Sequence, residues 1–255
     1  MASPSATLTA IGADMPATSL DEVLAAAELT TRVDRKYIVP HAMIHEVVAC
    51  VTGAASSDLH VLEIDGRRSS LYETVYFDTP NRQSYLGAAY GRRRRFKVRT
   101  RTYLDSDRCQ LEVKLNGGRG ESAKVALAMP SRDRGRITAE GYAFISEHLP
   151  VTLDGPLHPA VTTRYRRMTV VDYAGTARIT CDTDLSMEAP DGRVACLDAA
   201  VVVETKSSGP PTMFDRVLWR HGCRPAPISK FAVGMALLVP GLPANKWHRT
   251  LNRPS

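Results

Sequence analysis

The sequence predicts a mainly β fold of the α+β class, in which eight antiparallel strands close into a barrel with a charged interior and several flanking helices. Two observations support this prediction. Eight segments alternate between apolar and polar residues with a period of two, which is the period of a half-buried strand. Short turns such as Asn116-Gly117-Gly118 separate several of them, and helices are few. Many strands on short turns favour an antiparallel barrel.

The elements can be predicted in chain order. Residues 1–18 are small and polar, and we expect a flexible N-terminal arm. Ser19 and Glu22 form a capping box that opens a helix to about Leu29. Further helices are predicted over 41–52, after Thr138, from Thr212 to Gly222 and over 231–239. The predicted strands are 31–39, 71–78, 94–104, 109–116, 122–129, 161–172, 176–184 and 199–207. No repeat or linker interrupts the chain, so we expect one domain over 19–247 and a C-terminal tail over 248–255.

Composition limits the possible partners and compartments. The 255 residues carry a formal net charge of +6 and a pI near 9.2, which favours an anionic partner. The five cysteines are dispersed without zinc-ligand spacing, so we expect reduced thiols in a cytoplasmic protein. No apolar stretch approaches the roughly 18 residues of a membrane span, and no signal peptide precedes the predicted domain.

The charged positions of the strands share one face, because side chains at i and i+2 point the same way. That face contains Arg32, Asp34, Lys36, Arg95, Lys97, Arg99, Arg101, Glu112, Lys114, Lys124, Tyr165, Arg167, Arg178, Thr180, Asp182, Glu204 and Lys206. For a single strand, a solvated outer face is the usual explanation. Basic residues recurring on seven strands instead suggest a lumen. Two like charges about 6 Å apart repel by roughly 3 kcal/mol at an effective dielectric constant near 20, so such a lumen requires counter-anions. A chain of phosphates would supply them.

These segments resemble the VTC domain, the polyphosphate polymerase branch of the triphosphate tunnel metalloenzyme (CYTH-like) superfamily. The resemblance extends from about residue 30 to residue 247. It rests on Arg32-Val-Asp-Arg-Lys-Tyr37, Tyr76-Phe-Asp-Thr-Pro80, Phe96-Lys-Val-Arg-Thr-Arg-Thr-Tyr103, Leu111-Glu-Val-Lys114, Tyr165-Arg-Arg167, Arg178-Ile-Thr-Cys-Asp182, Val203-Glu-Thr-Lys206 and Ser229-Lys-Phe231. Any one of these motifs is weak, but eight in this order are specific.

The resemblance implies an eight-stranded antiparallel tunnel and a set of phosphate-binding residues. These are Lys36, Arg99, Arg101, Lys114, Lys124, Arg167, Arg178 and Lys230, and we expect Lys206 to join the nucleotide-binding set. Glu204 matches the metal-binding glutamate of the family and would hold Mn²⁺ or Mg²⁺. Some members have a second lysine three residues before the Ser-Lys lysine. This chain has Pro227 there, so that contact is missing or supplied elsewhere.

The implied reaction transfers the terminal phosphate of ATP to a growing polyphosphate chain. Its acceptor is already anionic and needs no general base, which agrees with the absence of any catalytic His or Cys arrangement. Two alternatives keep the fold: a triphosphate hydrolase and a non-catalytic polyphosphate-binding module. The run Arg92–Arg95 and the pI suggest nucleic acid as a third. No nucleic-acid-binding motif accompanies the run, and the lumen of an eight-stranded barrel is too narrow for duplex DNA. We therefore expect no nucleic-acid partner.

Overall fold

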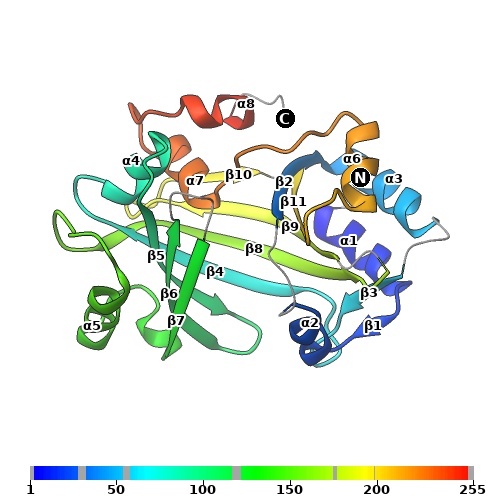
Figure 1. Ribbon diagram of the computed structural model, residues 1–255, viewed down its shortest axis with the longest axis horizontal. Helices are drawn as coiled ribbons and strands as arrows, with labels where there is room; N and C mark the ends of the chain where they lie inside the picture. Colours follow the sequence, from blue (N-terminus) through cyan, green and yellow to red (C-terminus); the bar gives the residue numbers. More distant parts are fainter. Residues whose placement is uncertain are drawn as a thin grey trace.

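Eight strands form one continuous antiparallel ladder in the computed structural model, which describes residues 3–27, 33–53, 58–116, 122–174, 177–197 and 199–251 (Figure 1). In spatial order they are β2 (Val33–Pro40), β11 (Ala200–Ser207), β9 (Ala177–Glu188), β8 (His158–Asp172), β4 (Ser70–Asp78), β5 (Arg95–Tyr103), β6 (Arg108–Asn116) and β7 (Ser122–Met129). These are the eight strands predicted from the sequence, so the mainly β class and the antiparallel arrangement are confirmed. Arg32 and the turn at Gly117-Gly118 lie outside the described residues.

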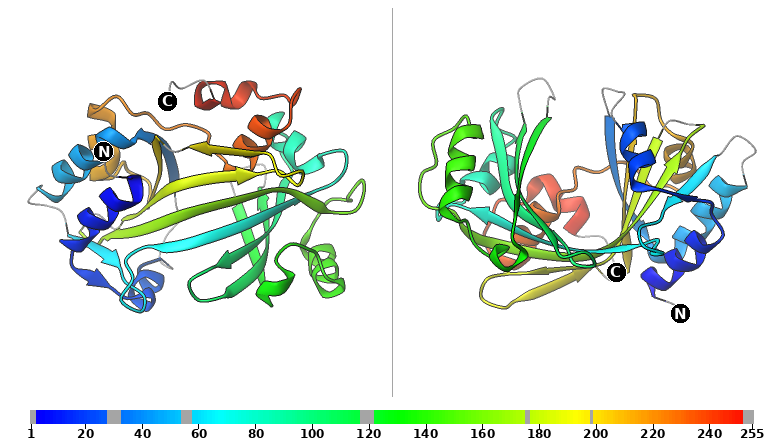
Figure 2. Two further views of the ribbon diagram at one scale, coloured as in Figure 1. Left: turned by 180° about the vertical axis from the view of Figure 1, so that it is seen from behind. Right: turned by 90° about the horizontal axis from the view of Figure 1, so that it is seen from below.

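The sheet curls without closing into a full barrel, and we call its concave side the hollow. Seen from below, β5, β6 and β7 stand on one side of the hollow and β2 and β11 on the other (Figure 2). Within the described part of the chain, the outermost strands β2 and β7 form no ladder with each other. The predicted closure is therefore not present, although the curvature is. Period-two alternation determines which face a side chain takes, but it contains no signal for whether the two edge strands meet.

Helices on the outside cover the apolar face of the sheet. On the β2 side lie α1 (Pro4–Ala13), α3 (His41–Thr52) and α6 (Met213–Arg220), which pack in one cluster with Tyr37, Val39 and Val203. On the β5 side, α5 (Ala139–His148) contributes Ile145 to a second cluster with Val98. In β2 and β11 the outward residues Tyr37, Val39 and Val203 are odd-numbered, so the even-numbered charged residues of these strands face the hollow. In β5 the outward residue Val98 is even-numbered, so Lys97, Arg99 and Arg101 face it.

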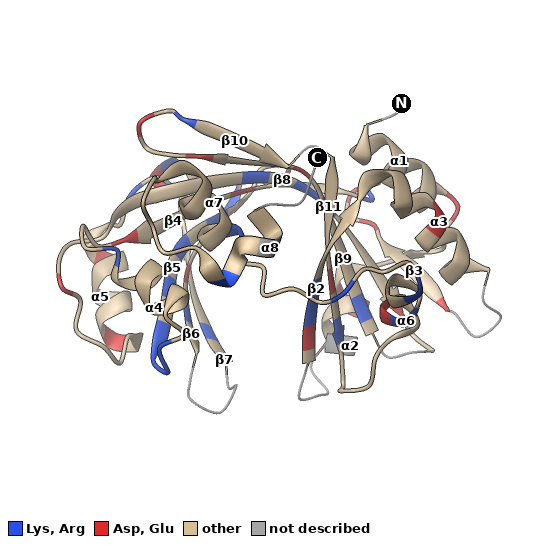
Figure 3. Cartoon of the chain, turned by 90° about the horizontal axis from the view of Figure 1, so that it is seen from above, with Lys and Arg blue, Asp and Glu red and all other residues tan. Residues whose placement is uncertain are grey.

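One helix lies at the end of the hollow itself. Helix α7 (Lys230–Leu238) packs with Ile38, Val202 and Tyr76, whose side chains stand on the inner face of the sheet. A Cβ atom on Gly234 would meet the Val161 Cγ2 atom at 3.0 Å, so any larger residue would require Val161 to shift by a few tenths of an ångström. Helices α4 (Gln83–Ala89) and α8 (His248–Leu251) and the short η2 (Asn245–Trp247) lie at the same end (Figure 3). The inner face is therefore apolar beneath α7 and charged beyond it.

Several elements were not predicted from the sequence. Where we expected a loose arm, α1 buries Leu8 to 3% exposure, and β1 (Ala17–Thr18) pairs with β3 (Leu59–Leu62). Within the expected C-terminal tail, α8 begins at His248. The helix predicted from Ser19 is present as α2 (Leu20–Ala27), with both hydrogen bonds of its capping box between Ser19 and Glu22, and its predicted end at Leu29 lies outside the described residues. The helical turn η1 (Ser131–Asp133) and β10 (Val194–Leu197) were not predicted. Helix α1 consists mostly of small residues, and its large aliphatic side chains are Leu8 and Ile11 alone, so its sequence shows no amphipathic pattern.

A buried carboxylate fixes the turn after β4. Asp78 is 3% exposed and accepts backbone N–H groups from Thr79, Ser84 and Tyr85. Burial raises the pKa of Asp78, while these three hydrogen bonds act to lower it. Asp78 therefore holds the first turn of α4 against the end of the strand.

Candidate functional site

The ladder register brings the predicted basic residues to one face, because residues directly opposite each other in a sheet share a face. On one side of the hollow, Lys97 of β5 lies opposite Lys114 of β6, which lies opposite Lys124 of β7. The remaining opposed pairs are Arg99 with Glu112, Arg101 with Gln110, Lys36 with Glu204, Lys206 with Arg178 and with Asp34, and Arg167 with Asp182. Lys and Arg accordingly follow the strands around the hollow (Figure 3).

Glu112 joins three of the predicted cations on the β5 side. Its carboxylate is 1% exposed and accepts hydrogen bonds from Arg99 Nε at 2.6 Å and Lys124 Nζ at 3.3 Å. Arg101 Nη1 lies 4.0 Å from the same carboxylate. Burial acts to raise the pKa of Glu112, but the positive charges of Arg99, Arg101 and Lys124 outweigh it and lower that pKa to about 2. Glu112 therefore stays ionised and holds these side chains in place.

On β9, Asp182 likewise holds two cations in place. It is 1% exposed and accepts a bidentate pair of hydrogen bonds from Arg167, at 2.6 Å from Nε and 2.8 Å from Nη2. Lys230, the first residue of α7, donates to the same carboxylate and lies 4.4 Å from the centre of the Tyr165 ring. Burial acts to raise the pKa of Asp182, and Arg167 and Lys230 lower it overall. Helix α7 thus brings Lys230 to the inner face, although its own segment has no strand period.

Two lysines share two carboxylates on β2 and β11. Lys206 Nζ lies 2.9 Å from Glu204 Oε1 and 2.9 Å from Asp34 Oδ2, and Lys36 Nζ lies 3.1 Å from Glu204. Although burial acts to raise the pKa of Glu204, Lys36 and then Lys206 lower it far below its ordinary value. The Glu204 carboxylate is therefore ionised and able to contact a cation.

Lys97 and Lys114 differ from the cations that are paired with Glu112, Asp182 and Glu204. Within the described residues, no carboxylate lies within 4.0 Å of either ammonium group. Burial, followed by the charges of Arg99, Lys114 and Lys36, lowers the pKa of Lys97 to about 7. Burial, followed by Lys36 and Arg99, also lowers the pKa of Lys114. The sequence placed Lys97 on the charged face but gave it no role, although the same period-two signal marks it.

Three tyrosine rings lie against the guanidinium groups of the site. Tyr72 and Tyr165 stack with their ring centres 5.2 Å apart, and the Arg167 guanidinium lies 5.3 Å from each ring. Arg101 lies 5.8 Å from Tyr72, and Arg99 lies 5.8 Å from Tyr76. Cation–π contacts of this kind limit the motion of the guanidinium groups, so the site is organised before a ligand arrives.

The carboxylates of the inner face limit the kind of metal site that this chain can form. Within the described residues, no group of three or more His, Cys, Asp or Glu side chains could enclose an ion, and none of the five cysteines, all of them described, is in a disulfide bond. Glu204 and Asp34 both form an ion pair with Lys206, so their two carboxylates lie close together on neighbouring strands. Mg²⁺ characteristically binds through one or two carboxylates together with substrate phosphates, so this donor set fits an ion bound with a phosphate ligand.

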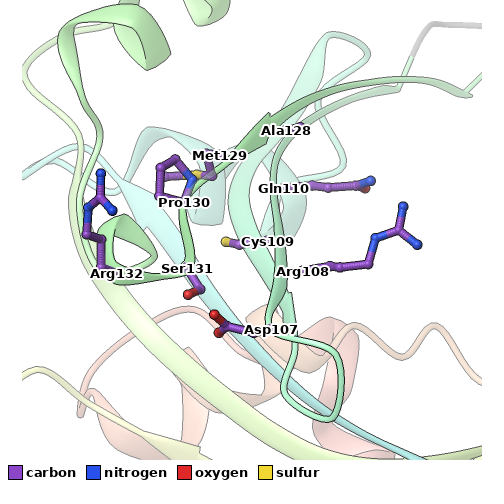
Figure 4. A pocket seen from close by; sticks show the side chains of 9 residues that line it. All are labelled: Asp107, Arg108, Cys109, Gln110, Ala128, Met129, Pro130, Ser131 and Arg132. Carbon is purple, nitrogen blue, oxygen red and sulfur yellow. The ribbon is translucent and has the colours of Figure 1, made fainter.

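A separate cleft lies at the far ends of β6 and β7. It has a volume of about 520 Å³ and is lined by Asp107, Arg108, Cys109, Gln110, Ala128, Met129, Pro130, Ser131 and Arg132. Gln110 and Arg108 point to one side of β6 and Cys109 to the other (Figure 4). None of the predicted phosphate-binding residues lines it.

In the described part of the chain there is also no helix long and apolar enough to cross a membrane.

Comparisons with known proteins identify the family and the fold. A family model for the VTC domain matches residues 31–239. A solved structure of a candidate adenylyl cyclase from Hippeastrum, described as having a dominant triphosphatase activity, is 15% identical. The similarity covers 82% of this chain and 98% of that one, with a TM-score of 0.50. A protein from Pyrococcus horikoshii is 12% identical over 80% of this chain and 95% of its own, with a TM-score of 0.43. No curated protein sequence matches.

Proposed function

Because the chain belongs to the VTC domain family, we propose that it is a polyphosphate polymerase that transfers the terminal phosphate of ATP to inorganic polyphosphate. The observation that carries this proposal is the excess of positive charge on the inner face. Four carboxylates, Asp34, Glu112, Asp182 and Glu204, stand among Lys36, Lys97, Arg99, Arg101, Lys114, Lys124, Arg167, Arg178, Lys206 and Lys230. A chain of phosphates would neutralise the remaining charge.

The arginines and lysines have different parts in this proposal. Carboxylates and rings fix Arg99, Arg101 and Arg167, and guanidinium groups bind phosphate oxygens in a bidentate manner. They would hold the triphosphate in one position, in line with the acceptor. The lysines carry mobile point charges, which allow a polymer to shift along the face between transfers. We assign Lys36, Lys114, Lys124, Lys206 and Lys230 to this role, with Arg178 beside Lys206.

The ionisation of the carboxylates favours transfer over hydrolysis. A general base that activates water works best with a pKa near the working pH. The pKa values of Glu112, Asp182 and Glu204 are all lowered, and each carboxylate is bound by cations. The terminal oxygen of a polyphosphate acceptor needs no deprotonation. It would form a bond to the γ-phosphorus of ATP while the bond from that phosphorus to the β–γ bridging oxygen breaks, and ADP leaves.

Glu204 and Asp34 would hold the divalent ion, Mn²⁺ or Mg²⁺, together with oxygens of the triphosphate. When bound, such an ion neutralises charge on the phosphate oxygens. Lys36 and Lys206 keep Glu204 ionised in its absence. These lysines can turn toward the phosphates once an ion takes their place.

The experiment that tests this function is incubation with ATP, Mn²⁺ and short polyphosphate, followed by chain-length analysis on a gel. We expect a ladder of longer chains and stoichiometric ADP from the wild type, and at least a 100-fold slower rate from Glu204→Gln, because loss of a charge-stabilising group typically costs about 10²–10³ in rate. Release of orthophosphate without longer chains would identify a triphosphate hydrolase. Tight polyphosphate binding without turnover would identify a binding module.

A further inference from the structure

Lys97 connects the charged part of the inner face to helix α7. Its ammonium group donates a hydrogen bond of 2.8 Å to Ser229 Oγ. Ser229 is the N-cap of α7, and its Oγ also accepts the backbone N–H of Ala232 at 3.4 Å. Lys97 therefore lies where the first turn of the helix meets the row of lysines on β5, β6 and β7.

The groups around Lys97 leave its positive charge uncompensated. Basic groups surround it: Arg95 and Arg99 on its own strand, Lys114 on β6, Lys36 on β2, and Lys230 beside Ser229 on α7. The carboxylates of Glu112 and Asp78, on the two strands beside β5, form hydrogen bonds with other groups. Glu112 binds Arg99 and Lys124, and Asp78 binds the backbone of α4. Tyr76 on β4 faces Arg99. Several cations with no unpaired carboxylate beside them, among the described residues, favour the binding of an anion.

We propose that Lys97, with Lys114 and Ser229, binds one phosphate group of the polyphosphate at the α7 end of the hollow. This inference rests on the proposed function and adds a residue to its site. It also supplies a cation for the contact that Pro227 cannot make, since residue 227 precedes Ser229 by two positions. Here the ammonium group comes from strand β5 rather than from the segment that precedes α7.

A consequence for protonation separates this role from a structural one. Because the pKa of Lys97 is lowered to about 7, its amine is largely neutral at pH 8 in the free protein. A bound phosphate favours the charged ammonium form and raises that pKa. Binding at pH 8 should therefore take up close to one proton at Lys97, whereas at pH 6 the group is already protonated. A hydrogen bond that only fixed Ser229 would produce no such uptake.

The test is calorimetric titration of the full chain with tripolyphosphate at pH 8, in two buffers of different ionisation enthalpy. The wild type, Lys97→Arg, Lys97→Met and, as a control away from the row, Lys246→Arg are compared. The ionisation of the ligand itself cancels in these comparisons. We expect Lys97→Arg to bind within about 3-fold of the wild type but to take up roughly one proton fewer, because arginine stays charged. Lys97→Met should bind at least 10-fold more weakly, and Lys246→Arg should match the wild type.

Two outcomes overturn the assignment of Lys97. One is equal proton uptake by the wild type and Lys97→Arg at pH 8. The other is undiminished affinity in Lys97→Met. Either result leaves tripolyphosphate binding, and with it the proposed function, intact. A wild type that binds no tripolyphosphate at all would instead contradict the proposed function. Repeating the comparison of the wild type with Lys97→Arg at pH 6, where Lys97 is already protonated, should remove the difference in proton uptake between the two proteins.

Discussion

Replacing Arg99 with alanine is expected to lower the rate of polyphosphate synthesis by about 10²–10³-fold, the usual cost of losing one preorganised group that stabilises developing charge. Arg99 is bonded to Glu112 and lies over the Tyr76 ring, so its guanidinium is fixed at the centre of the charged face. The substitution also leaves the buried Glu112 with only Lys124 and the more distant Arg101. The rate should be measured at saturating ATP with a fixed polyphosphate primer.

The matched control is Arg93→Ala, which removes the same side chain from the exposed run before β5. We expect its synthesis rate to equal that of the wild type. Equal rates for Arg99→Ala and the wild type would remove β5 from the site. A large loss in Arg93→Ala, with Arg99→Ala unaffected, would instead place the chemistry at the exposed run.

Replacing Asp182 with asparagine is expected to lower the free energy of unfolding by about 3–5 kcal/mol, since removal of one partner leaves buried charges unpaired. Both Arg167 and Lys230 lose their counter-charge, and asparagine preserves the shape of the side chain. Equilibrium unfolding in urea measures the loss. Tripolyphosphate should stabilise this variant more than it stabilises the wild type, because the ligand returns negative charge to the two cations.

Asp184→Asn provides the comparison, because Asp184 is two residues away on the same strand and exposed. Its positive φ of 52° suits asparagine as well as aspartate. We expect an unfolding free energy within about 0.5 kcal/mol of the wild type. A loss equal to that of Asp182→Asn would show that the effect comes from the strand rather than from the ion pairs. Identical stabilisation of both variants by tripolyphosphate would show that the ligand does not contact Arg167 and Lys230.

The strands and their faces could be predicted because alternation is a local signal. The register of β5 with β6 and of β11 with β9 places Arg99, Lys114, Arg178 and Lys206 on the face expected from period two alone. The helix from Thr212 was also predicted from a local signal, its N-terminal cap, and the capping box of Thr212 with Asp215 is present. Lys230 could not be placed by periodicity. Its position depends on how α7 packs, and the family resemblance supplied the expectation that it belongs to the site.

Other features depend on contacts between distant segments and leave little trace in the sequence. The ion-pair partners of the cations are one example. Alternation shows that Glu112 and Asp182 face inward, but not that each joins cations from different elements. The position of α7 is another, because its segment is apolar on all sides and contains no indication that it packs inside the sheet. Gly234 becomes informative only once Val161 is known to lie against it.

The central claim is that the basic inner face binds the phosphate chain, and a crystal structure of the protein with tripolyphosphate and Mn²⁺ tests it most directly. We predict phosphate oxygens within hydrogen-bonding distance of Arg99, Arg101 and Arg167, with the metal ion on Glu204. Phosphates bound only along the exposed residues Arg92–Arg94, with the inner face occupied by water, would contradict the claim.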